Sequence, residues 1–148
     1  TVIPDAQLRS QTWRYVLEPP ADGWQNPGYD DSAWHLGKAG FGSKGTPGAL
    51  VETNWQSSDI WLRQTVKLDS LPANPALSIH HDEDCEVYIN GQLAMKRTDY
   101  TTGYIYLPLS KHAAKLLRVG ENTIAVHCRQ TRGGQYIDVG LVDVKAGK

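Results

Sequence analysis

The chain has 148 residues, 40% of them hydrophobic, which is enough for one domain with a sizeable core. Its net charge is −1 and its 15 lysines and arginines are scattered, which excludes the basic surface typical of nucleic-acid binding. No apolar run approaches the roughly 20 residues that cross a bilayer, so no membrane partner is expected. The sequence begins at Thr1 without an initiator methionine. We therefore expect residues 1–148 to form a single domain excised from a larger multidomain protein.

The N-terminal third of the chain contains one clear strand pattern among loop signals. Alternation over residues 12–17 predicts a strand, and residues 30–34 are predicted to form one helical turn that directs Trp34 toward the core. Residues 37–48 contain five glycines and one proline, so we expect them to be irregular.

The rest of the chain alternates strand patterns with turn residues. Strands are expected at residues 60–68, 77–81, 85–89, 92–95, 103–107, 123–129 and 136–144. Asn90 and Gly91 supply the two central residues of a type I′ hairpin turn. A short helix is expected over residues 110–117, with Ser110 as its N-cap and Gly120 closing it.

This spacing of strands and turns is typical of an all-β protein, an antiparallel jelly-roll β-sandwich with one short helix. The residues predicted to be mostly buried are Trp34, Trp61, Leu62, Leu77, Ile79, Val87, Ile89, Ile124, Val126 and Leu141. Cys85 and Cys128 lie at inward-phased positions of predicted strands and are expected to be buried free thiols, which behave as small apolar side chains. A disulfide between them needs Cα atoms within about 7 Å, which the sequence leaves open.

Five segments in order carry a family resemblance. They are residues 29–34, 40–42, 59–63, 86–91 and 120–126. With them the chain resembles the galactose-binding-like β-sandwich accessory domains of glycoside hydrolases, above all the sugar-binding-type domain of the β-galactosidase and β-glucuronidase family. Residues 127–131 and 133–141 are similar to segments of related large bacterial proteins assigned as glycosidases.

The resemblance implies a galactose-binding-like sandwich that is not an enzyme by itself. It implies an accessory module of a secreted or periplasmic glycan-degrading enzyme, in contact with carbohydrate or with a neighbouring catalytic domain. Two alternatives remain open: a purely structural domain that binds no ligand, and a small stand-alone glycoside hydrolase. Fold analogy alone does not choose between them.

The candidate ligand-binding residues lie in two loops. Trp55 is expected to be an exposed indole that stacks on a sugar ring. Arg129, Arg132 and Gln135 can donate hydrogen bonds to hydroxyls or carboxylates, and Tyr136 can stack. The alternative is a structural loop in which an arginine pairs with the acidic turn at residues 82–84 and fixes the end of the sandwich.

Residues 80–84, His-His-Asp-Glu-Asp, form the densest polar cluster. Their carboxylates suit calcium, for which Asp82 and Asp84 are the candidate ligands, and their imidazoles suit zinc. The alternative is a solvated turn whose aspartates bond to nearby backbone amides. We expect the turn and no cofactor, with calcium as the metal to test.

Overall fold

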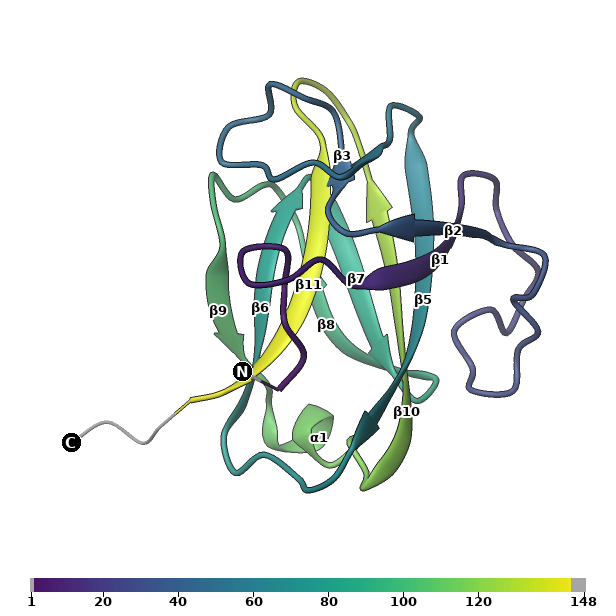
Figure 1. Cartoon of the computed structure of the whole chain (residues 1–148), viewed down its shortest axis with the longest axis vertical. Helices are drawn as coiled ribbons and strands as arrows, with labels where there is room; N and C mark the ends of the chain where they lie inside the picture. Colours follow the sequence, from purple (N-terminus) through teal and green to yellow (C-terminus); the bar gives the residue numbers. More distant parts are fainter. Residues whose placement is uncertain (1, 145–148) are drawn as a thin grey trace.

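A computed structural model describes residues 2–144 and shows two facing β-sheets (Figure 1). Their strands carry apolar side chains at alternating positions. Residue 1 and residues 145–148 of the predicted domain lie outside the described residues. The six-stranded sheet has the order β2 (His35–Lys38), β1 (Thr12–Val16), β5 (Asp59–Leu68), β10 (Gly120–Arg129), β7 (Asp84–Ile89) and β8 (Gln92–Arg97). The five-stranded sheet has the order β4 (Thr53–Asn54), β3 (Phe41–Gly42), β11 (Tyr136–Asp143), β6 (Pro75–Asp82) and β9 (Ile105–Pro108).

The core lies between the two sheets, where every second side chain of each strand points inward. Leu62 on β5, Val126 on β10 and Val87 on β7 are neighbours across one sheet, and Ile79 on β6 pairs with Val139 on β11 in the other. All the predicted core residues are buried, so the all-β sandwich and its core are confirmed.

Three short strands and the helix end differ from the sequence-based expectations. The glycine-rich region contributes β2 and β3, and β4 pairs with β3 in parallel, so the second sheet is mixed. Helix α1 (Lys111–Ala114) starts where predicted, because the Ser110 hydroxyl accepts a hydrogen bond from the Ala113 amide at 3.0 Å. It ends at Ala114 with Lys115 as its C-cap, and Gly120 instead opens β10. No helix among residues 2–144 is long and apolar enough to span a membrane.

The two cysteines face each other within the six-stranded sheet. Cys128 on β10 lies opposite Cys85 on β7, and both are buried free thiols, as predicted. Burial raises the pKa of the Cys85 thiol to about 12 and also raises that of Cys128. Both side chains therefore serve as protonated, apolar parts of the core.

Two segments cover the outer faces of the sheets. The loop of residues 17–34 projects beside β1, β2 and β5 (Figure 1), and the buried Arg63 on β5 holds it by hydrogen bonds. The N-terminal segment crosses the five-stranded sheet, where Ile3 bridges to Leu141 and the Ala6 amide donates to the Asp138 carboxylate at 2.7 Å.

Candidate functional site

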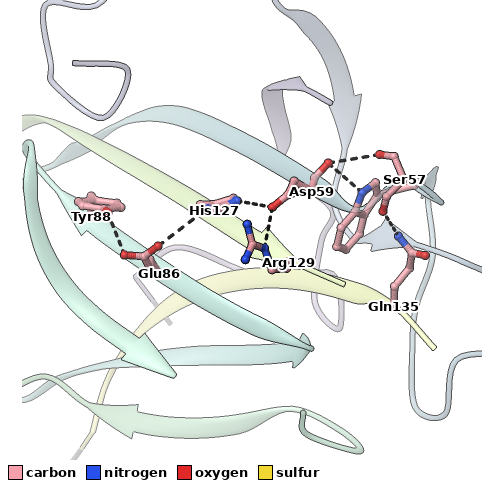
Figure 2. A network of polar contacts seen from close by, with 8 residues as sticks. Ser57, Asp59, Glu86, Tyr88, His127, Arg129 and Gln135 are labelled. Carbon is pink, nitrogen blue, oxygen red and sulfur yellow. Dashed lines mark hydrogen bonds and ion pairs between the residues drawn. The ribbon is translucent and has the colours of Figure 1, made fainter. Parts of the chain in front are cut away.

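A chain of polar contacts crosses the outer face of the six-stranded sheet (Figure 2). His127 on β10 lies between Trp61 of β5 and Glu86 of β7 in the strand register. Its Nε2 is 2.7 Å from Asp59 Oδ1, and its Nδ1 is 3.6 Å from Glu86 Oε1. Tyr88, two residues further along β7, donates its hydroxyl to Glu86 Oε2 at 3.1 Å. Each carboxylate thus has a fixed partner.

An aromatic side chain also packs against the face of the His127 ring. The indole of Trp61 stacks on it with centroids 4.6 Å apart and planes 5° from parallel. Trp61 is 8% exposed, so its ring presents little surface to a ligand. The Asp59, His127 and Glu86 side chains therefore form a connected row of polar contacts on this face of the sheet.

Two adjoining hollows lie near this row, and His127 and Glu86 line the first of them. The first has a volume of about 230 Å³ and is lined by the ends of β7, β8 and β10: Asp84, Cys85, Glu86, Lys96, Arg97, Thr98, His127 and Arg129. The second, about 520 Å³ and more open, shares Lys96, Arg97 and Thr98 with the first and extends to Asp99 and Tyr100. Tyr100 is 59% exposed. Charged side chains and an accessible aromatic ring thus meet at one surface, which we call the β7–β8 cleft.

The structure corrects the two predicted stacking residues. Trp55 is 1% exposed, and its indole Nε1 donates to the Asp59 carbonyl at 3.2 Å, so it fastens a loop to β5. Tyr136 is fully buried, with its hydroxyl 2.7 Å from that of Tyr104 and donating to the Leu50 carbonyl at 3.1 Å. Neither ring faces solvent, so the prediction that they stack on a sugar is wrong.

Of the three other predicted ligand residues, one is buried and two are exposed. Gln135 is 6% exposed and donates its amide to the Ser57 carbonyl at 2.9 Å, so the prediction that it orients a ligand is wrong. Arg129 and Arg132 are exposed, but only Arg129 lines the first hollow. The loop does contact the acidic turn, as the structural alternative predicted. The main-chain amide of Arg132, rather than an arginine side chain, donates a hydrogen bond to the Glu83 carboxylate at 2.7 Å.

The acidic turn separates its two candidate metal ligands onto different sheets. Asp82 ends β6, and burial, followed by the charge of Glu83, raises its pKa to about 6. Asp84 begins β7, and its Oδ1 accepts a hydrogen bond from the Asp99 amide at 2.9 Å. Within residues 2–144, no group of three or more histidine, cysteine or acidic side chains is placed to hold a metal ion.

Calcium dependence is tested directly by thermal unfolding. We expect the melting temperature to stay the same when a chelator is added and when calcium is restored, because a ligand that binds only the folded state would raise it. Circular dichroism melts in both conditions measure this. A melting temperature that falls with chelator and recovers with calcium, and does not do so in Asp82→Asn, would instead establish a calcium site at the turn.

Of the residues that line the β7–β8 cleft, sequence reasoning named Arg129 as a ligand residue and Asp84 as a metal ligand, and missed Lys96, Arg97, Thr98 and Tyr100. Residues 96–100 form a polar run that ends in tyrosine, which is the only local signal. Their place beside Arg129 depends on the register in which β7 pairs with both β8 and β10, where Cys85 lies opposite Arg97 and Cys128. No local pattern predicts that pairing.

Comparison with known proteins gives matches to solved structures alone. No family model matches the sequence, and no curated protein matches it. A glycosyl hydrolase family 2 member from Bacteroides cellulosilyticus matches with a TM-score of 0.62 and 16% identity over 90% of this chain. A β-glycosidase from Bacteroides vulgatus gives 0.57 and 21%, and a β-glucuronidase from Bacteroides uniformis gives 0.57 and 19%, each again over 90% of this chain.

The chain spans only about a fifth of the solved proteins that it matches. It covers 20% of the first two chains and 18% of the third. At these identities the similarity concerns the fold. The chain therefore has the β-sandwich fold of a small domain that occurs within glycoside hydrolase family 2 enzymes, as the sequence resemblance implied.

Proposed function

We propose that the chain is a non-catalytic module of a secreted or periplasmic glycan-degrading enzyme and that it contacts carbohydrate at the β7–β8 cleft. The observation that carries this proposal is the meeting of an exposed aromatic ring, Tyr100, with charged and hydroxyl side chains along two adjoining hollows. A sugar has an apolar face and a rim of hydroxyls, so it needs both kinds of contact.

The positions of the cleft residues suggest which part of a sugar each would contact. Tyr100 lies at the open end, where one face of a sugar ring could rest on the phenol. Lys96, Arg97 and Thr98 lie between the hollows and offer donors to hydroxyls on either side. His127 and Glu86 line the first hollow and are already held by Asp59 and Tyr88, so they lose little freedom on binding, which lowers the entropic cost of association.

Titration of the chain with oligosaccharides tests this function. We expect saturable NMR shifts at the β7–β8 cleft with a Kd on the order of 0.1–1 mM, because an open site buries little area. Tyr100→Ala should weaken binding about five-fold, since the loss of one aromatic contact costs about 1 kcal/mol. The matched control is Tyr106→Ala, which removes a tyrosine that is 61% exposed on β9, outside the cleft.

The outcomes of this titration separate the alternatives. Equal weakening by the two tyrosine variants, or shifts elsewhere on the surface, would place the sugar outside the cleft. The absence of shifts with every neutral and acidic glycan would favour a purely structural module that packs on a neighbouring domain. That alternative is supported by the small share, 17–21%, that the chain covers of several matched enzymes. Turnover of chromogenic glycosides by the isolated chain would contradict a non-catalytic role.

A further inference from the structure

We infer that the chain carries an oxidation site, at which Cys85 and Cys128 join β7 to β10 through a disulfide when a small-molecule disulfide is present as the oxidant. In the structure both residues are free thiols. Three features of the pair support the bond: the type of strand pairing at which they meet, the face that they share, and their place at the ends of their strands. Formation of the bond does not depend on carbohydrate binding.

The hydrogen bonds at the two ends of β10 show how its residues are paired. The Asn90 amide donates to the Thr123 carbonyl at 2.9 Å, on the β7 side of β10. The Gln130 amide donates to the Ser58 carbonyl at 2.7 Å, on the β5 side. The backbone groups of successive residues in an antiparallel strand point alternately to the two neighbouring strands. Odd-numbered residues of β10 therefore bond to β7, and even-numbered residues bond to β5.

This alternation gives the pairing type at the two cysteines. Cys128 is even-numbered, so its backbone bonds to β5, and it lies opposite Cys85 in a non-hydrogen-bonded pair. The Cα atoms of such a pair are about 4.5 Å apart and its side chains lie closer than in a hydrogen-bonded pair. Disulfides bridge Cα atoms that are about 4.4–6.8 Å apart. The backbone separation at this pair thus fits a disulfide.

The two side chains also share one face of the sheet. Residues directly opposite on antiparallel strands point to the same side, and both cysteines point into the core, with 2% and 0% of their surface exposed. Burial raises the pKa of the Cys128 thiol, and the neighbouring Cys85 raises it further, as is expected of sulfur atoms that lie close together. Rotation of the two side chains is therefore enough to bring the sulfur atoms into bonding distance.

The position of the pair gives an oxidant a route to it. Cys85 is the second residue of β7, Cys128 is the last but one of β10, and Cys85 lines the first hollow. Strand ends open more readily than strand centres. Burial raises the pKa of both thiols, so the reactive thiolate forms when this end of the ladder opens. Oxidation thus requires local opening of the strand ends rather than unfolding of the whole domain.

The reaction is a thiol–disulfide exchange in two steps. Cys85, which lines the hollow, loses its proton, and its thiolate attacks one sulfur atom of the small disulfide. A mixed disulfide forms, and the other half of the oxidant leaves as a thiolate that takes up the proton. Cys128 then loses its proton and attacks the Cys85 sulfur, which releases the second small thiol. Two protein thiols are oxidised to one disulfide, and one small disulfide is reduced to two thiols.

Incubation of the folded 148-residue chain with oxidised glutathione tests the inference. We expect the mass of the chain to fall by that of two hydrogen atoms, the chain to remain monomeric, and neither cysteine to be alkylated after later unfolding. The melting temperature should rise by roughly 5–10 °C over that of the reduced chain, as for a typical native disulfide. The control is Cys128→Ala, which should hold at most one glutathione and show no rise in melting temperature.

The equilibrium between the reduced and oxidised chains in glutathione buffers gives a second measurement, which needs no variant. The disulfide should be favoured at least ten-fold more in the folded chain than in concentrated urea, because a bond that stabilises the folded state is stabilised by it to the same extent. An equal or smaller preference in the folded chain would overturn the inference. So would a chain whose two cysteines are both still alkylated after incubation with the oxidant.

Discussion

Replacement of Arg63 by alanine should lower the free energy of unfolding by roughly 3–5 kcal/mol, the cost of breaking a buried charge pair from one side. Arg63 is 2% exposed, although it lies on the outer face of the six-stranded sheet. Its Nε donates to Asp31 Oδ2 at 2.9 Å, and its Nη1 donates to the carbonyls of Trp24 and Asn26 at 2.6 and 2.9 Å. The guanidinium thus replaces the water that these acceptors would otherwise bind.

The same side chain holds the whole covering loop of residues 17–34. Its Nη2 donates to the Tyr29 carbonyl at 3.3 Å, and its guanidinium carbon lies 5.3 Å from the centroid of the Tyr29 ring. Removal of Arg63 leaves the Asp31 carboxylate and three carbonyl groups without their donor. We therefore expect protease cleavage within the loop to accelerate in the variant, in addition to the loss of global stability.

Urea denaturation of three variants measures the effect. Arg14→Ala is the control. Within residues 2–144 the Arg14 side chain makes a single hydrogen bond, to the Trp34 carbonyl at 3.2 Å, so its loss should cost about 1 kcal/mol or less. Arg63→Lys should lie between the two, since an ammonium keeps the charge but not the fork of donors. A value for Arg63→Ala equal to that of Arg14→Ala would contradict the anchoring role of Arg63.

Local patterns in the sequence were sufficient to predict the sandwich and its core. The alternation in β5, β7 and β10 is local, and the Asn90-Gly91 turn joins β7 to β8 as predicted, with Asn90 at a φ of 50° and Gly91 at 89°. Since a strand has a period of two, correct alternation also assigns each side chain to a face. The missed strands are two to four residues long, too short for a period to emerge.

The exposure of loop residues depended on how each loop folds back on the sheets. Trp55 follows β4 in a polar segment, yet its indole is buried against β5. Tyr136 has the outward phase of β11, yet a loop 86 residues away covers it, with Leu50 accepting its hydroxyl. The phase of a strand predicts the face of a side chain, but not what covers that face. For this reason the candidate ligand residues were mostly wrong while the core was correct.

A buried polar cluster on the five-stranded sheet gives the second large effect, which depends on pH. Asp138 on β11 is 2% exposed, and its Oδ2 accepts hydrogen bonds from the Ala6 amide at 2.7 Å and the Tyr104 hydroxyl at 2.6 Å. Its Oδ1 has no partner in the described residues. Burial raises the pKa of Asp138 to about 6, with hydrogen bonds opposing this and the nearby Asp5 adding to it.

The sign of the effect follows from the raised pKa. The folded protein binds the Asp138 proton more tightly than the unfolded chain, whose pKa is the ordinary 3.8. The stabilisation is complete below the unfolded pKa and is lost as the pH rises through the folded value of about 6. The pKa of Asp82 is raised in the same way. His80 opposes both, because burial lowers its pKa and its protonation at acidic pH favours unfolding.

Asp138→Asn isolates the contribution of Asp138 from the others. The asparagine keeps an oxygen for Ala6 and Tyr104 and stays neutral at every pH, so it resembles the protonated aspartic acid. Relative to the parent, its free energy of unfolding should increase by on the order of 2–3 kcal/mol between pH 4 and pH 7, since each pKa unit corresponds to about 1.4 kcal/mol.

Urea denaturation of the parent and Asp138→Asn at half-unit steps from pH 4 to pH 7 measures this difference. Asp82 remains in both proteins. His80 lies opposite Asp138 on β6, so the same comparison is repeated in a His80→Gln background, in which no imidazole titrates beside Asp138. Asp69→Asn, on an exposed turn, controls for the removal of a negative charge as such. A difference between Asp138→Asn and the parent that stays constant with pH would show that Asp138 is ionised in the folded protein at pH 4. In that case the Ala6 and Tyr104 donors, rather than burial, would determine its charge.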